Sequence, residues 1–211
     1  MLELPASTIV NRVVSKEQIY RHSQLSTVDR ERYIEQIAKI RWTNKIAPDT
    51  VPIAAGQYDE LEVFEIELRT DNDRDILRLL QPIDEVIPYP ILFHIILLSG
   101  SDEYIIAYKT VNQNNENRAV VHEYFISDWL NRVQLTMSGT TVDQIYANFI
   151  HQIAPSVDVA NYNLADAIQR HDGDRQIKRQ IERLRQQMMR EPSSARRQEL
   201  ALECAKLRKQ L

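Results

Sequence analysis

Two glutamates, Glu65 and Glu67, have the spacing in this chain that is best suited to chemistry. They lie within Leu61–Leu68, where apolar and polar residues alternate in the pattern typical of a β-strand. Side chains two apart on a strand point to the same side, so the two carboxylates could hold a divalent cation such as Mg²⁺. Metal-dependent nucleases use comparable strand carboxylates with an acidic residue upstream, for which Asp59 or Glu62 is the candidate.

The nuclease interpretation is the alternative, because the pattern departs from the usual one. Glu65-Ile66-Glu67 lacks the lysine that is commoner in such sites, and Lys45 or Lys109 would have to supply a distant positive charge. A strand whose outer face is simply solvated explains the same residues. We therefore favour a protein with no catalytic residues and no cofactor or metal. The enzymatic alternative keeps Mg²⁺ with Glu65, Glu67 and Asp59.

The other candidates for chemistry are isolated in the sequence. His94 lies in Ile91–Leu98, an apolar run that predicts a central strand covered on both faces, and a lone histidine there is more often a hydrogen-bonded core residue than a ligand. His122 and Glu123 are adjacent on an expected strand and point to opposite faces. The single cysteine, Cys204, excludes an internal disulfide, and four isolated glycines provide no phosphate-binding loop.

The surrounding segments predict the elements that must position these residues. A helical stripe capped at Ser26 and ending at Ile40 precedes the first strand, and a helix containing Pro82 follows it. A capping box at Thr141 begins another helix. This order predicts an α/β (α+β-like) fold with a mixed four-stranded sheet covered by helices, in which one parallel crossover is followed by an antiparallel meander. The expected strands are 61–68, 91–98, 104–108 and 120–126.

The C-terminal segment Asp174–Leu211 differs from the rest in charge and periodicity. It carries 11 Lys and Arg against 5 Asp and Glu, whereas Met1–Gly173 carries 15 against 25. Apolar residues recur at spacings of three and four on two narrow helical stripes, which Pro192 separates. Such helices require a packing partner, because short isolated helices are marginal in water. The stripes are Ile177, Ile181, Leu184 and Met188, then Leu200, Cys204, Leu207 and Leu211.

We therefore expect an α/β body at residues 1–172 and, after a break at Gly173, a charged coiled-coil-like helical hairpin or arm at residues 173–211. The stripes could bind another protein or a second copy of the chain, the cations could contact nucleic acid, or the helices could fold against the acidic body. Partner binding is favoured, because a phosphate-binding helix needs no clean stripe. In the partner-binding interpretation, the residues that contact the partner are Ile177, Ile181, Leu184, Met188, Leu200, Leu207 and Leu211. In the nucleic-acid interpretation, the contacts are Arg175, Lys178, Arg179, Arg183 and Arg185.

Composition limits the class of protein. The chain has 211 residues, 43% of them hydrophobic and 27% charged, which is ordinary for a soluble globular protein. The net charge of −4 argues against a generally basic nucleic-acid binder. The N-terminal residues lack the pattern of a signal peptide, and the longest apolar run is too short to span a bilayer. We expect a cytoplasmic protein without membrane contact.

Four segments carry a family resemblance: Leu4–Thr8, Trp42–Lys45, Val63–Leu68 and Ile87–Phe93. Together with the helix from Thr141 and the charged C-terminus, they resemble the bacterial domain-of-unknown-function family 4391. The resemblance implies a companion of helicases and DNA methyltransferases in restriction-like, phage-defence gene clusters, and it implies no catalytic residues. We therefore expect a non-catalytic accessory or assembly subunit of a bacterial DNA-modification or phage-defence complex, bound to a helicase or DNA methyltransferase through its C-terminal helices.

Overall fold

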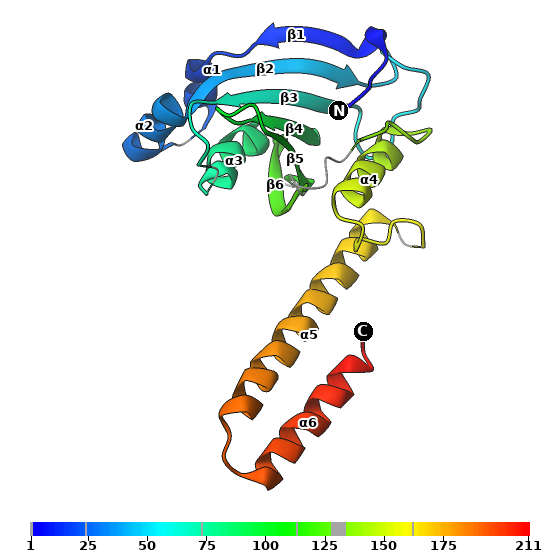
Figure 1. The fold of residues 1–211 in the computed structure, drawn as a ribbon. Helices are drawn as coiled ribbons and strands as arrows, with labels where there is room; N and C mark the ends of the chain where they lie inside the picture. The colour runs from blue at the N-terminus through cyan, green and yellow to red at the C-terminus, as the bar shows by residue number, and fades with distance from the viewer. Residues whose placement is uncertain (1, 24, 73, 113, 128–133, 162) are drawn as a thin grey trace. The chain divides into compact units, whose positions relative to one another are not determined.

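The chain forms two compact units, Met1–Pro155 and Ser156–Leu211, which we call the body and the arm (Figure 1). The computed structural model describes residues 2–23, 25–72, 74–112, 114–127, 134–161 and 163–211. The units divide earlier in the chain than the boundary expected at Gly173. Among the described residues, the structure contains no helix long and apolar enough to cross a membrane.

The body contains one six-stranded sheet in the order β1-β2-β3-β4-β5-β6, so the expected number of four strands is wrong. Strands β3 and β4 are parallel, and the other neighbouring pairs are antiparallel. The expected crossover and meander are therefore confirmed. The strands are β1 (Ile9–Val13), β2 (Ile37–Ile46), β3 (Leu61–Leu68), β4 (Ile91–Ile96), β5 (Asp102–Asn112) and β6 (Asn115–Ile126).

Helices α2 and α4 begin at the caps that their sequences predict, Ser26 and Thr141. The Ser26 side chain accepts a hydrogen bond from the Asp29 N–H at 3.2 Å, and Thr141 accepts one from the Gln144 N–H at 3.2 Å. Helix α3 continues through Pro82. The helices are α1 (Lys16–His22), α2 (Thr27–Gln36), α3 (Ile76–Val86), α4 (Val142–Ile153), α5 (Leu164–Arg190) and α6 (Ser194–Arg208), with a short 3-10 turn, η1 (Ala6–Thr8).

Strand β2 occupies part of the segment that was expected to be helical. Helix α2 ends at Gln36, and Ile37 and Ile40 are buried on the strand instead. A register shift between Ile37 and Lys39 inserts one residue, so both isoleucines enter the same core although they are three residues apart. The bulge therefore imitates the spacing of a helical stripe, and the helix assignment at this position is wrong.

One hydrophobic core of the body lies on the face of the sheet that we call the core face. Trp42, Phe64 and Phe93 are direct neighbours there on β2, β3 and β4. The ring centroids of Trp42 and Phe64 are 6.5 Å apart, and those of Phe64 and Phe93 are 6.4 Å apart. Removing such large side chains from water is a principal source of stability. The helices contribute Ile19, Tyr33, Ile76, Leu79, Leu80 and Ile83 to this core.

The arm is a helical hairpin with a core of its own (Figure 1). Helix α5 runs without interruption through Gly173, so the expected break is absent. The expected separation at Pro192 is confirmed, and Ser193 caps α6. The two stripes face each other: Ile181, Leu184, Leu200 and Cys204 are 5–8% exposed, and Ile177, Met188 and Leu207 pack beside them.

Candidate functional site

The face of the sheet opposite the core brings Glu65 into a row of polar side chains. Arg41, Glu65, His94 and Tyr104 are direct cross-strand neighbours on β2 to β5. Glu65 Oε1 lies 3.8 Å from Arg41 Nε, and Glu65 Oε2 lies 3.9 Å from His94 Nδ1. His94 Nε2 is 2.8 Å from Asp102 Oδ2, and its ring stacks on Tyr104 with centroids 4.8 Å apart. We call these five residues the polar row.

The position of His94 differs from the expected one. It is hydrogen-bonded as predicted, but its side chain is 24% exposed and lies outside the core. Strand β4 is therefore not covered on both faces along its length. The ring nitrogens face two different carboxylates, so Glu65 and Asp102 hold the orientation of the imidazole.

The carboxylates of the predicted nuclease site do not converge. Glu67 lies beside Glu65 and is 3.7 Å from Lys39 Nζ, so each glutamate has a cation on β2. Asp59 precedes β3, and roughly 13 Å of strand separates Leu61, the first residue of β3, from Glu65. Glu62 lies on the opposite face from both glutamates, because strand side chains alternate. Among the described residues, neither of the two predicted upstream acids, Asp59 and Glu62, therefore lies beside the Glu65 and Glu67 pair.

Glu62 is unsuited to ligating a metal for a second reason. Its side chain is buried, with 4% of the residue exposed. Burial, together with the neighbouring Glu60, raises the pKa of Glu62 to about 8. Glu62 is therefore largely protonated at neutral pH, whereas a metal ligand must be ionised.

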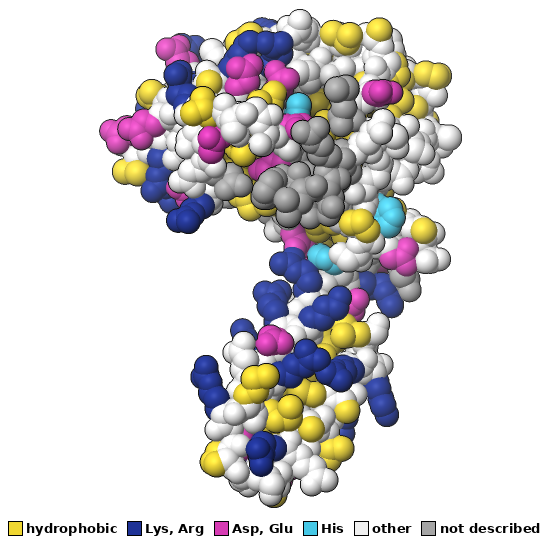
Figure 2. Space-filling model, in the orientation of Figure 1, with side chains coloured by type: hydrophobic (Ala, Val, Ile, Leu, Met, Phe, Trp, Pro, Cys, Tyr) yellow, Lys and Arg dark blue, Asp and Glu magenta, His cyan; other side chains and the backbone are white. Residues whose placement is uncertain are grey.

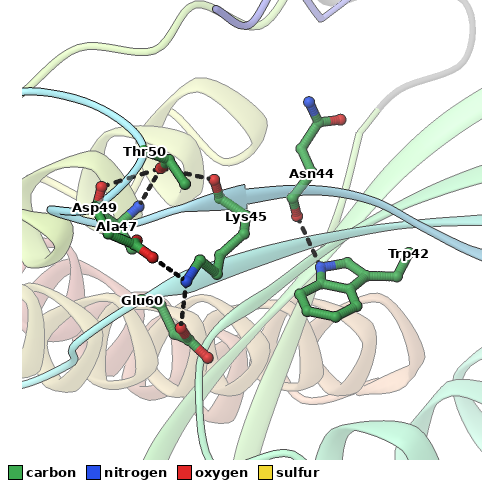
Figure 3. A network of polar contacts seen from close by, with 7 residues as sticks. All are labelled: Trp42, Asn44, Lys45, Ala47, Asp49, Thr50 and Glu60. Carbon is green, nitrogen blue, oxygen red and sulfur yellow. Dashed lines mark hydrogen bonds and ion pairs between the residues drawn. The ribbon is translucent and has the colours of Figure 1, made fainter. Parts of the chain in front are cut away.

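Lys45, a candidate cation for the nuclease, is engaged at the far end of β2 (Figure 3). Its Nζ donates to Asp49 Oδ2 at 2.6 Å and lies 3.6 Å from Glu60 Oε2. The hydrogen bond to Asp49 is the main cause that raises the pKa of Lys45. In the same network the Trp42 indole donates to the Asn44 carbonyl at 3.0 Å, which fixes the ring. Lys45 is thus a partner of the loop acids rather than of Glu65.

Lys109, the other candidate cation, is fully buried in an ion pair with Asp84. Its Nζ donates to Asp84 Oδ1 at 2.9 Å and to the carbonyls of Asp84 and Ile87 at 3.2 and 2.9 Å. Burial lowers the pKa of Lys109 and raises that of Asp84, while their mutual attraction opposes both changes. Because Asp84 lies on α3 and Lys109 on β5, the pair joins this helix to the sheet.

The tyrosines of the body complete this arrangement around β5. Tyr146 on α4 donates to the Ala107 carbonyl at 2.5 Å and accepts from the Lys109 N–H at 3.1 Å. Tyr58 donates to the Lys109 carbonyl at 2.5 Å. Burial raises the pKa of both phenols, which therefore stay neutral at physiological pH. These contacts indicate a structural role for the polar groups around Lys109.

A cavity of about 560 Å³ opens on the core face of the sheet. Its lining comes from β1, α1, β2, β3, α3 and β6, so side chains from both edge strands of the sheet border it. The sequence analysis did not identify this cavity, because no local pattern joins residues so far apart in the chain. The apolar lining residues include Trp42, Phe64, Ile83 and Ile87, and the polar lining residues are Arg12, Gln18, Asn115 and Arg118.

The arm presents its apolar stripes inward and its arginines outward. At 100° per residue, Arg175, Arg179, Arg183 and Arg190 lie on the side of α5 opposite Ile181 and the rest of the stripe. We call these four exposed residues the arginine ridge. Figure 2 shows Lys and Arg side chains distributed along the arm. The other predicted nucleic-acid contacts, Lys178 and Arg185, lie on α5 between the ridge and the stripe, and Arg185 lies 3.7 Å from Glu182.

The residues predicted to bind a partner are therefore mainly those that close the hairpin. Ile181, Leu184 and Leu200 are nearly inaccessible while α5 and α6 are packed together. Leu211, the last predicted contact, follows α6 and is 50% exposed. A partner can reach the buried stripe only if the hairpin opens, whereas the outer surface is accessible without any change.

Comparison with proteins of known function and with solved structures found no match to this chain. The family described as "Domain of unknown function (DUF4391)" matches residues 2–211, which is nearly the whole sequence. The chain therefore belongs to this family of unknown function.

Proposed function

We propose that this protein is a non-catalytic accessory subunit that joins a DNA-modification or phage-defence assembly through its arm. The observation that carries the proposal is the arm itself: its apolar stripe closes on itself and leaves a basic outer surface on a separate compact unit. The candidate catalytic groups support it too, since Glu65, Glu67 and Lys45 each lie beside an opposite charge.

The partner in this proposal is a helicase or a DNA methyltransferase with an acidic surface. An acidic patch complements the arginine ridge and would speed the encounter electrostatically. The inward stripe then acts indirectly by holding the ridge on a rigid hairpin. Pairing of two chains through exchanged helices is a further route to assembly, which would use the same stripe residues between chains.

A pull-down from native cell extract tests this proposal. The baits are the full chain, the ridge variant Arg179→Glu/Arg183→Glu, and a control with the same charge change on exposed body residues, Arg21→Glu/Arg74→Glu. We expect the full chain and the control to recover a helicase or methyltransferase, and the ridge variant to lose it. Recovery by all three baits would place the interface elsewhere, and recovery by none would contradict an accessory role.

Direct contact with nucleic acid is a second candidate function, which the position of the ridge favours. Its arginines extend over roughly 22 Å of helix, and their planar guanidinium groups match phosphate oxygens. Binding of this kind falls steeply with salt. A gel shift with duplex DNA at low and at physiological salt tests it, using the same ridge variant and control. Absence of any shift by the full chain at low salt would eliminate this candidate.

A further inference from the structure

The cavity on the core face has the features of a small-molecule site, and it involves none of the arm residues discussed above. Its volume of about 560 Å³ lies within the range of about 300–1,000 Å³ that is typical of ligand pockets. Its lining is mainly apolar with a few polar groups, which is also typical of such pockets.

Two aromatic side chains, Trp42 and Phe64, line the cavity. Trp42 and Phe64 are cross-strand neighbours whose rings are inclined by only 11° to each other. The hydrogen bond from the Trp42 indole to the Asn44 carbonyl satisfies the polar group of the ring and fixes its position. A planar ring system would stack on the partly exposed Trp42 indole, as nucleobases do on aromatic side chains.

Arg12 reaches the cavity because of a bulge in the edge strand β1. Ile9 is opposite Asn44, but Arg12 is opposite Trp42, so one extra residue lies between them in β1. Asn11, at this bulge, has a left-handed φ of 50°. With uninterrupted pairing Arg12 would lie opposite Arg41, on the face of the polar row. The bulge therefore moves a guanidinium from the polar face to the cavity, and bulges are frequent beside binding sites.

The charge of the cavity is opposite to that of the unit that contains it. Met1–Pro155 has eight more acidic than basic residues. Among the described residues that line the cavity, however, Arg12 and Arg118 are the charged ones, and carboxylates are absent. Two guanidinium groups from the two edges of the sheet select an anion, and their planar forks suit phosphate or carboxylate. Gln18 and Asn115 add amide groups that both donate and accept hydrogen bonds.

From these observations we infer that the cavity binds a nucleoside monophosphate, with the base against Trp42 and the phosphate near Arg12 and Arg118. A phosphate monoester carries about two negative charges at neutral pH, and planar guanidinium groups suit its oxygens. The chain has no glycine-rich loop to hold further phosphates. The amides of Gln18 and Asn115 would contact the heteroatoms of the base or the ribose hydroxyls.

Isothermal titration of the full chain with AMP, GMP, CMP and UMP tests this inference. Adenosine, inorganic phosphate and benzoate are the probes that separate the contributions of ring and charge. We expect saturable micromolar binding of at least one nucleotide, and binding at least about tenfold weaker in Arg12→Gln and in Arg118→Gln. Arg74→Gln removes an exposed arginine that does not line the cavity and should leave the affinity unchanged.

Two further variants distinguish loss of a ligand contact from a general disturbance of the fold. Arg12→Lys keeps the charge but loses the bidentate fork, so it should bind more tightly than Arg12→Gln and less tightly than the unaltered chain. Trp42→Leu should weaken nucleotides but leave phosphate unaffected, and circular dichroism checks that each variant is folded. Absence of saturable binding up to about 5 mM would overturn the inference. So would adenosine, phosphate or benzoate binding as tightly as the nucleotides, or equal loss in Arg74→Gln.

Discussion

The body and the arm use their polar and apolar residues in opposite ways. The body encloses a fully buried ion pair, Lys109 with Asp84, within a core supplied by a sheet and several helices. The arm buries one stripe between two helices and keeps its arginine ridge in solvent. This difference shows that a broad hydrophobic core can accommodate a buried ion pair. A single apolar stripe stabilises a two-helix hairpin only when the charged side chains remain in solvent. Four changes test this comparison.

Breaking the buried pair of the body should have the largest effect. Lys109→Met leaves the Asp84 carboxylate buried without its cation, and we expect the free energy of unfolding to fall by about 3–5 kcal/mol. Urea denaturation followed by near-ultraviolet circular dichroism measures the loss. Lys39→Met, which removes a partly exposed lysine from the same sheet, should cost less than about 1 kcal/mol. A similar loss in both variants would show that burial of the pair is not what matters.

Placing a charge in the stripe should affect the arm to a similar or smaller extent. Ile181→Asp removes a buried apolar side chain and introduces a carboxylate, at a cost of about 3 kcal/mol. We expect loss of helical signal at 222 nm in proportion to α5 and α6. Leu202→Asp makes a comparable change at a leucine that is 60% exposed and should retain the signal. Retention by Ile181→Asp would contradict a hairpin held by its stripe.

The buried Glu62 should make the stability of the body depend on pH. Its pKa is raised to about 8 in the folded protein, above the ordinary value of 4.5, so the folded state binds the proton more tightly. The resulting stabilisation is complete below about pH 4.5 and is lost as the pH rises to about 8. Glu62→Gln should remove this loss, on the order of 3 kcal/mol between pH 5 and pH 8. Denaturation at several pH values, with the exposed Glu31→Gln as control, measures it; parallel curves would refute the assignment.

Neutralising the polar row should have the smallest effect. Glu65→Gln removes the partly exposed ion pair with Arg41 and changes the contact with His94, so we expect a change of less than about 1 kcal/mol in unfolding free energy. We also expect no cleavage of DNA in Mg²⁺ or Mn²⁺ by either the unaltered chain or this variant. Metal-dependent cleavage that is lost on Glu65→Gln would instead support the nuclease alternative and identify the polar row as its site.

Periodicity predicted the elements of this fold wherever the strands and helices are regular. The alternation in Leu61–Leu68 and the capping box at Thr141 both identified their elements correctly. Strand β2 was missed because its bulge places Ile37 and Ile40 three residues apart on one face. Strand β1 was missed because an edge strand with exposed residues carries no apolar alternation.

The candidate sites depend on relations that the sequence does not display. The spacing of Glu65 and Glu67 correctly placed both on one face, but their cations on β2 come from the register between strands. The cavity depends on a one-residue bulge that turns Arg12 toward Trp42, and on the approach of both sheet edges. The stripes of the arm were recognisable, but helical spacing alone does not say whether the partner is the same chain or another one.

The single cysteine of the chain allows the opening rate of the hairpin to be measured by thiol labelling. Cys204 is 5% exposed, and its Sγ lies 3.9 Å from the Ile181 carbonyl, so a thiol reagent can reach it only when α6 separates from α5. The rate of labelling under native conditions therefore reports how often the hairpin opens, and no cysteine has to be introduced by mutation. Since Cys204 is the single cysteine, each labelled molecule records one such event. A partner that binds the closed hairpin would slow the labelling of Cys204, and a partner that exchanges helices with it would accelerate the labelling.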